Sequence, residues 1–139
     1  MRDTFTKTSI YVEFDVGDDF APEQLTEQLK IQPSLSYKKG EKKHPLVEGS
    51  ELRYKFSRWA LKSKEMESEK IESHINQIFD MLKNKVDVLN EFKKNNPGLI
   101  YKIWFVINVR NSEIPKILLP HYFIHFVDSV TADIGFDFI

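Results

Sequence analysis

The spacing of the hydrophobic residues changes along the chain, and this change constrains the fold more than any other feature of the sequence. Between residues 10 and 16, and again between 101 and 109, large apolar residues recur at every second position, which is typical of half-buried β-strands. Between residues 71 and 89 they recur every three or four positions, which is typical of an amphipathic α-helix. A chain with both periods is predicted to fold into a mixed domain of strands and helices.

The predicted elements alternate between the two types. Strands are expected at residues 10–16, 53–62, 101–109 and 134–139, and helices at residues 22–30, within 65–94 and at 121–130. We therefore predict an α+β single domain, with a mainly antiparallel sheet of four to five strands and helices packed on one face. In this prediction, two β-α-β units are joined by the long helix within residues 65–94.

Smaller features refine these elements. The even positions Tyr54 and Phe56 and the odd positions Trp59 and Leu61 do not share one strand face, so an extra residue is needed between them. We predict a β-bulge at Ser57-Arg58 that turns both Phe56 and Trp59 to the core.

Loop and helix-end signals complete the prediction. A short edge strand is expected near Tyr37, inside a loop that spans residues 34–52. Pro22 suits the first turn of a helix, which makes Ala21 a candidate N-cap residue. Ser63 or Ser68 is expected to cap the long helix.

Composition bounds the domain count and the classes of function. A chain of 139 residues predicts one domain covering residues 1–139, and 41% hydrophobic residues are enough to build its core. Lys and Arg (20) balance Asp and Glu (21), which argues against dedicated nucleic-acid binding. The absence of cysteine excludes disulfides, thiolate nucleophiles and iron–sulfur clusters.

No targeting or membrane signal is visible in the sequence. The first seven residues hold no apolar run of the kind found in signal peptides. The longest apolar stretch, Ile103 to Ile107, is far shorter than the roughly 18 residues that a spanning helix needs. We expect a cytoplasmic protein that does not contact membranes.

Several short motifs resemble one protein family over almost the whole chain. They are the run Tyr11-x-x-Phe14-x-x-Gly17-Asp18-Asp19-Phe20-x-Pro22-x-x-Leu25-x-x-x-Leu29-x-Ile31-x-Pro33, then Lys39-Gly40-Glu41, Trp59-x-Leu61-x-Ser63 and Asp133-Ile134-Gly135-Phe136-Asp137-Phe138. The chain resembles the bacterial family catalogued as domain of unknown function 4279, although that family usually ends in Tyr where this chain has Phe138-Ile139. The resemblance implies a small bacterial α+β domain without catalytic residues to transfer, and by analogy an interaction or immunity-like role.

Two groups of residues have the composition of a metal or acid–base site. The adjacent carboxylates Asp18 and Asp19 could bind a metal ion or act as acid and base, but one of them capping the helix at Pro22 is the simpler interpretation. His121, His125 and Asp128 have the spacing of one helical face and resemble a two-histidine, one-carboxylate metal set. Because the same helix must bury its phenylalanines, we interpret the three as a solvated face and expect no metal and no cofactor.

A lysine-rich loop offers a different chemistry. Four lysines surround Gly40 and could bind a small anion or an acidic ligand, although a solvated loop is the simpler explanation: Lys38, Lys39, Lys42 and Lys43. No phosphate-binding glycine motif and no G-x-S-x-G nucleophile motif occurs in the sequence. Nothing in the sequence is therefore a catalytic signature.

The face of the sheet that helices do not cover is the favoured candidate site. Alternation places six polar and aromatic residues on it: Tyr11, Glu13, Lys55, Lys102, Trp104 and Asp137. A mixture of aromatic and charged side chains suits a protein–protein contact, whereas cross-strand pairing such as Glu13 with Lys102 is the structural alternative. We predict a non-catalytic binding or protein-interaction module with a protein partner or a second copy of the chain. The alternatives are an anion-binding domain that uses loop 38–43, and an enzyme with a site near Asp18 and Asp19.

Overall fold

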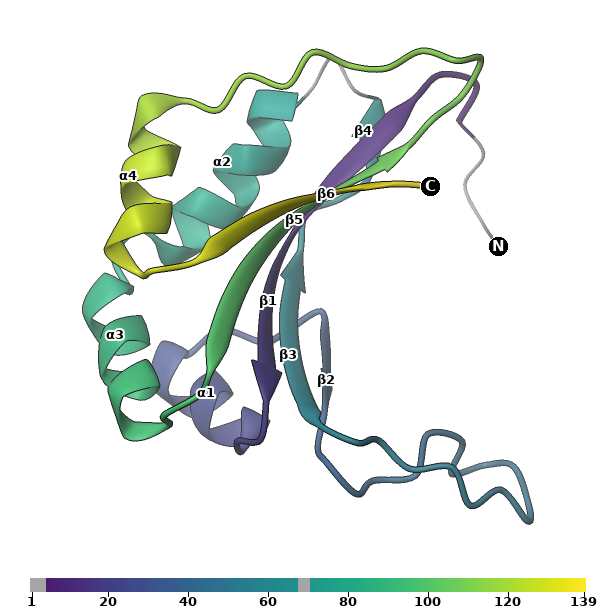
Figure 1. Cartoon of the computed structure of the whole chain (residues 1–139), viewed down its shortest axis with the longest axis vertical. Helices are drawn as coiled ribbons and strands as arrows, with labels where there is room; N and C mark the ends of the chain where they lie inside the picture. The colour runs from purple at the N-terminus through teal and green to yellow at the C-terminus, as the bar shows by residue number, and fades with distance from the viewer. Residues whose placement is uncertain (1–4, 68–70) are drawn as a thin grey trace.

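The computed structural model describes residues 5–67 and 71–139 and contains both types of element that the periodicities indicate (Figure 1). In chain order the elements are β1 (Ser9–Asp18), α1 (Pro22–Leu29), β2 (Leu35–Tyr37), β3 (Ser57–Lys62), β4 (Met66–Glu67), α2 (Ile71–Leu82), α3 (Val86–Asn95), β5 (Ile100–Asn108), α4 (His121–Ser129) and β6 (Asp133–Phe138). The order of strands and helices agrees with the prediction, and β2 is the short edge strand expected near Tyr37. Strand β4 is an addition, and the long helix is divided.

The strands form one six-stranded sheet in the order β2-β3-β1-β5-β6, with the short β4 also paired to β1. All pairs are antiparallel except β5 with β6, which are parallel. The predicted α+β class and mainly antiparallel sheet are confirmed, with six strands in place of four to five. The additional strand β4 is only two residues long, too short for a period of two to be visible in sequence.

Two crossover units build this sheet. Strands β1 and β2 are each antiparallel to β3, so they run parallel to each other with β3 between them, and α1 connects them. Strands β5 and β6 are adjacent, parallel and connected by α4. The two units contribute opposite edges of the sheet, and β1 and β5 meet at its centre.

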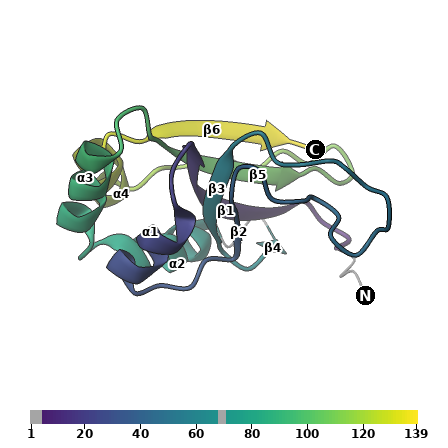
Figure 2. The ribbon, with the colours of Figure 1, turned by 90° about the horizontal axis from the view of Figure 1, so that it is seen from below.

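The helices cover one face of the sheet, and the core lies between them (Figure 2). The sheet contributes alternate residues of its central strands to this core, such as Phe14, Ile103 and Trp59, all fully buried. Leu25 of α1 and Ile78 of α2 are among the buried residues on the helix side. The other face is uncovered and concave, with the 38–56 loop projecting beyond it at the lower right of Figure 1.

The predicted β-bulge is wrong. Residues Ser57 to Lys62 pair with β1 in an unbroken register, so their alternation is regular. Phe56 precedes the strand and is 50% exposed, whereas Ser57 takes the buried position next to it. The Ser57 hydroxyl accepts a hydrogen bond from the Lys39 N–H at 2.9 Å, which explains how a polar residue is accommodated there. The irregular spacing of the apolar residues between Tyr54 and Leu61 therefore reflects the start of β3 at Ser57, and not a bulge within the strand.

The long helix is divided into α2 and α3. A turn at residues 83–85 separates them, and the Lys85 N–H donates to the Leu82 carbonyl at 2.8 Å. The apolar residues Leu82, Val86 and Leu89 keep helical spacing across the turn, so the period did not reveal it. The longest helix of the described chain, α2, does lie within residues 65–94.

Neither predicted cap of the long helix is found among the described residues. Ser63 does not act as a cap, because its hydroxyl accepts the Val12 N–H at 2.8 Å. Ser68 lies outside the described residues. The buried Ser63 hydroxyl thus ties the end of β3 to β1.

The last strand follows its predicted alternation, but its apolar face is only partly covered. Ile134, Phe136 and Phe138 pair with the core residues Ile103, Phe105 and Ile107 of β5. Because β6 lies at the edge of the sheet, Phe136 and Phe138 are nevertheless 44% and 53% exposed. In the part of the chain that the structure describes, no helix has the length and apolar character needed to cross a membrane.

Candidate functional site

The register of the central strands assembles the predicted uncovered-face residues into rows. Tyr11, Val106 and Asp137 are neighbours across β1, β5 and β6. Glu13, Trp104 and Gly135 form the next row, and Asp15, Lys102 and Asp133 the row after it. The structure thus places the predicted Tyr11, Glu13, Lys102, Trp104 and Asp137 on one face, which we call the open face. The predicted Lys55 precedes β3 and is not part of these rows.

An ion-pair network lies at the centre of the open face. The Arg58 guanidinium on β3 donates to Asp15 through Nε at 2.8 Å and to Glu13 through Nη2 at 3.0 Å. Lys62 Nζ lies 3.6 Å from the second oxygen of Glu13, which is only 5% exposed. The predicted pairing of Glu13 with Lys102 is therefore replaced by pairing with Arg58 and Lys62.

Arg58 is the residue that sequence reasoning missed. Burial alone would lower the pKa of Arg58, but its hydrogen bond and its attraction to Asp15, with the charge of Glu13, raise the pKa above its ordinary value. The guanidinium is therefore a fixed positive charge. With a regular alternation from Ser57, Arg58 and Trp59 lie on opposite faces of the strand, which places Arg58 on the open face. The predicted β-bulge at Ser57-Arg58 obscured this signal.

Trp104 is covered in part from within the chain, at Gly135 of β6. A Cβ atom on Gly135 would lie 2.4 Å from Cζ3 of the Trp104 ring, so the indole occupies the space that a side chain on β6 would fill. The ring is half-buried as a result. The sequence signal for this packing is the glycine in the middle of a strand, which commonly marks a close approach.

Tyr11 and Val106 complete the apolar part of the open face. Burial, and then the negative charge of Glu13, raise the pKa of the Tyr11 hydroxyl, which therefore stays protonated at neutral pH. Lys62 Nζ lies 5.8 Å from the centre of the Tyr11 ring, within the range of a cation–π contact. Val106 pairs with Tyr11 across the strands and is 7% exposed.

Two of the hollows along the open face share Asp15, Arg58 and Trp104. The larger has a volume of about 490 Å³ and extends to Tyr11 and Asp137. The other, of about 340 Å³, extends towards Phe56 and Ile100. Together they form a groove on the open face, lined by charged and aromatic groups. The open face is the concave side of the sheet in Figure 1.

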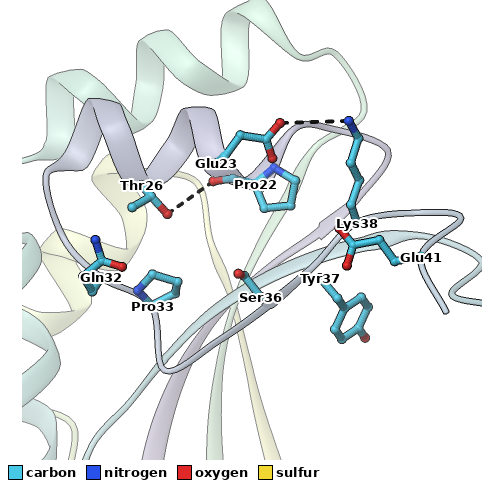
Figure 3. Close-up of a pocket in the computed structure, with 9 residues that line it drawn as sticks. All are labelled: Pro22, Glu23, Thr26, Gln32, Pro33, Ser36, Tyr37, Lys38 and Glu41. Atoms are coloured by element: carbon cyan, nitrogen blue, oxygen red, sulfur yellow. Dashed lines mark hydrogen bonds and ion pairs between the residues drawn. The ribbon is translucent and has the colours of Figure 1, made fainter. Parts of the chain in front are cut away.

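A separate hollow lies between α1 and β2 (Figure 3). It has a volume of about 430 Å³, and the Glu23 carboxylate and Lys38 Nζ lie 4.0 Å apart on its rim. Thr26 on its wall accepts a hydrogen bond from the Trp59 Nε1–H at 2.9 Å. Glu23 and Lys38 pair with each other, and Thr26 accepts the hydrogen bond of the buried Trp59. These three polar residues therefore have structural roles, and we do not take this hollow as the candidate site.

The lysine-rich loop does not gather its side chains around one point. Lys38 lies beside Glu23, and Lys39 Nζ is 3.5 Å from Asp19. Lys43 Nζ lies 5.7 Å from the centre of the Tyr54 ring, and Lys42 forms an isolated backbone bridge with Arg53. The four lysines thus have different neighbours, an arrangement that does not favour a shared anion.

Asp18 and Asp19 have separate roles. Asp18 ends β1 opposite Ser57 with a φ of 113°, a backbone conformation that is rare outside glycine. Asp19 pairs with Lys39 on the surface. The predicted aspartate cap is wrong, because Ala21 is the N-cap residue of α1 and no side chain of the described residues caps it.

His121, His125 and Asp128 lie on the exposed side of α4, as the burial of Phe123 and Phe126 on its other side requires. Among residues 5–67 and 71–139, no three histidine, aspartate or glutamate side chains are placed to hold a metal ion together. The interpretation of these three residues as a solvated face agrees with their placement.

The fold and the open face define a small α+β domain with a helix-covered sheet and an uncovered concave face. The chain belongs to the family described as Domain of unknown function (DUF4279), whose sequence profile matches residues 8–139. Neither the curated proteins nor the solved structures contain a match to this chain.

Proposed function

We propose that this protein is a non-catalytic binding module that holds a segment of another polypeptide on its open face. The observation that carries the proposal is the groove in which Arg58, fixed by Glu13 and Asp15, lies beside the aromatic side chains of Trp104 and Tyr11. Interfaces between proteins are enriched in Trp, Tyr and Arg at their centres, and these residues contribute most of the binding energy.

The charges of the groove indicate the chemistry of the partner. Glu13, Asp15 and Arg58 already satisfy one another, so they shape the groove more than they attract a ligand. No ion pair to Lys102 or Asp137 occurs within the described part of the chain. We therefore expect a segment with an apolar side chain against Trp104, a basic group near Asp137 and an acidic group near Lys102.

The same arrangement argues against the two alternatives. A small anion would meet carboxylates on the open face, and the lysines of loop 38–43 have separate neighbours. A general acid or base needs a carboxyl group that is free to exchange a proton with a substrate. Near the proposed Asp18 and Asp19 site, Asp19 instead forms an ion pair with Lys39. Glu13 and Asp15 accept hydrogen bonds from Arg58.

A peptide library with random sequences tests the proposal. Peptides selected for binding to the protein are measured by titration calorimetry against the wild type and against Trp104→Ala and Asp137→Lys. We expect enriched peptides with a basic and an apolar residue, and at least a roughly tenfold loss of affinity in each variant, equal to about 1.4 kcal/mol. The matched control His121→Lys changes an exposed residue of α4 and leaves affinity unchanged. Peptides that bind all variants equally would contradict the proposal.

A further inference from the structure

Strand β6 is an edge strand that nothing in the described chain covers. It pairs with β5 on one side only, and Figure 2 shows it at the outer border of the sheet. Phe136, Phe138 and the following Ile139 are 44%, 53% and 63% exposed. Edge strands with exposed apolar residues invite pairing with another strand, and proteins that avoid it place charged residues, proline or a bulge there. The sequence of β6 contains no proline, and its register with β5 is unbroken. Its two charged residues, Asp133 and Asp137, alternate with the phenylalanines and so lie on the other face of the sheet.

The backbone groups available for pairing follow from the bonds to β5. The Ile139 N–H donates to the Ile107 carbonyl at 2.9 Å, and the Ile139 carbonyl accepts the Val109 N–H at 3.2 Å. In a parallel ladder the residues that bond to one neighbour alternate with those that face away. Ile134, Phe136 and Phe138 therefore direct their N–H and C=O groups outward.

We propose that two copies of this protein form a dimer by antiparallel pairing of their β6 strands, with the two-fold axis at Phe136. In this register Phe136 lies opposite Phe136 of the second copy, and Ile134 lies opposite Phe138. Every outward N–H of these three residues then donates to a carbonyl of the second copy. The exposed phenylalanines cover each other on the helix side of the joined sheet.

The charges of β6 select this register over its neighbours. An axis at Gly135 would oppose Asp133 to Asp137 of the second copy, two like charges, and would leave Phe138 without a partner strand residue. A shift of one residue would set apolar side chains of one copy against the open-face residues of the other. With the axis at Phe136, Asp137 lies opposite Gly135 instead, and no two carboxylates face each other directly.

The joined sheet keeps the helices of both copies on the same side, because the two-fold axis is perpendicular to the sheet. The two open faces then form one continuous surface. This inference does not rest on the proposed function, because the phenylalanines lie on the opposite side of the sheet from Trp104. Pairing of one short strand buries a small area, so we expect a dissociation constant of roughly micromolar order.

Sedimentation velocity over a concentration series that brackets this value tests the dimer. We expect the wild type to shift from monomer to dimer, and Phe136→Asp and Phe138→Asp to remain monomeric, because each places carboxylates in the interface. Leu46→Asp is the matched control, since Leu46 is 98% exposed on the distant 38–56 loop, and it dimerises like the wild type. Phe136 stacks on Phe105, so Phe138→Asp decides the result if Phe136→Asp fails to fold. A wild type that is monomeric at every concentration overturns the proposal.

Because the chain lacks cysteine, a single-cysteine variant tests the register. Directly opposed residues of a hydrogen-bonded antiparallel pair have Cα atoms about 5.5 Å apart, within the roughly 4.4–6.8 Å that a disulfide spans. We expect Phe136→Cys to form a covalent dimer under mild oxidation at least about tenfold faster than Leu46→Cys. The dimer holds the two thiols introduced at position 136 next to each other, whereas two thiols at position 46 meet only by random collision. Equal rates for the two variants overturn the register at Phe136.

Discussion

At the scale of single residues, His74 links the stability of the fold to pH. The ring is fully buried on α2, with Nδ1 3.1 Å from the Ser63 hydroxyl, and Nε2 has no hydrogen-bond partner among the described residues. Burial lowers the pKa of His74, and a backbone hydrogen bond at Lys64 and the attraction of Glu65 offset this only in part. The folded protein therefore holds His74 neutral where the unfolded chain would protonate it.

We expect the free energy of unfolding to fall as the pH drops below about 6.5, the ordinary histidine pKa, by up to about 1.4 kcal/mol per pH unit. The unfolded state binds the extra proton, so the contribution of His74 is complete above that pH and decreases below it. Urea unfolding of the wild type and His74→Gln across this range measures the effect, which the variant should lack. His121→Gln, which changes an exposed histidine, should keep it. A His74→Gln variant with the wild-type pH dependence would contradict the assignment.

Gly135 provides a second residue-scale prediction. A Cβ atom there would meet the Trp104 ring at 2.4 Å, so Gly135→Ala must displace the indole from β6. We expect a loss of about 1–3 kcal/mol in unfolding free energy and a red shift of Trp104 fluorescence in a Trp59→Phe background. Gly17→Ala is the matched control in β1, because nothing lies within 4 Å of its added Cβ. Equal stability of the two alanine variants would show that the indole moves without cost.

At the scale of elements, the ion-pair network joins β1 to β3. Arg58→Met would leave the buried Glu13 with Lys62 as its remaining partner, and we expect a loss of about 1–3 kcal/mol, less than for a fully buried pair because Arg58 keeps a 25% exposed side chain. A Glu13→Gln/Arg58→Met double variant should recover part of the loss in urea unfolding. Lys83→Met removes the exposed pair with Asp80 and should cost less than about 1 kcal/mol. An equal cost for Arg58→Met and Lys83→Met would argue that the network is solvated.

The elements also show what the sequence could reveal. Periodicity located the long strands and the amphipathic helices because each buries one face against the core. It missed the turn between α2 and α3, because a three-residue break preserved the spacing of Leu82 and Val86. It misplaced Phe56, because the pattern cannot tell an irregular strand from residues that precede one.

For the candidate site, the sequence could predict which residues share a face of a strand, but not which residues pair with one another across strands. Alternation placed Trp104 and Lys102 on one face of their strand and Glu13 on the matching face of its own, since residues two apart on a strand share a side. The partners of those residues were not predictable, because strand order decides them: β3, and not only β5, lies beside β1. Arg58 is therefore identified as a site residue only from the register between β1 and β3.

At the scale of the whole molecule, the central place of β1 governs how the chain can fold during synthesis. This strand is made before its partners β3 and β5, which come from residues 57–62 and 100–108. Such long-range pairing must close large loops before its contacts form, which slows folding. The apolar face of β1 stays without β5 until residues 100–108 have left the ribosome. A nascent chain stalled before β5 therefore exposes an unpaired apolar strand to aggregation and to chaperones.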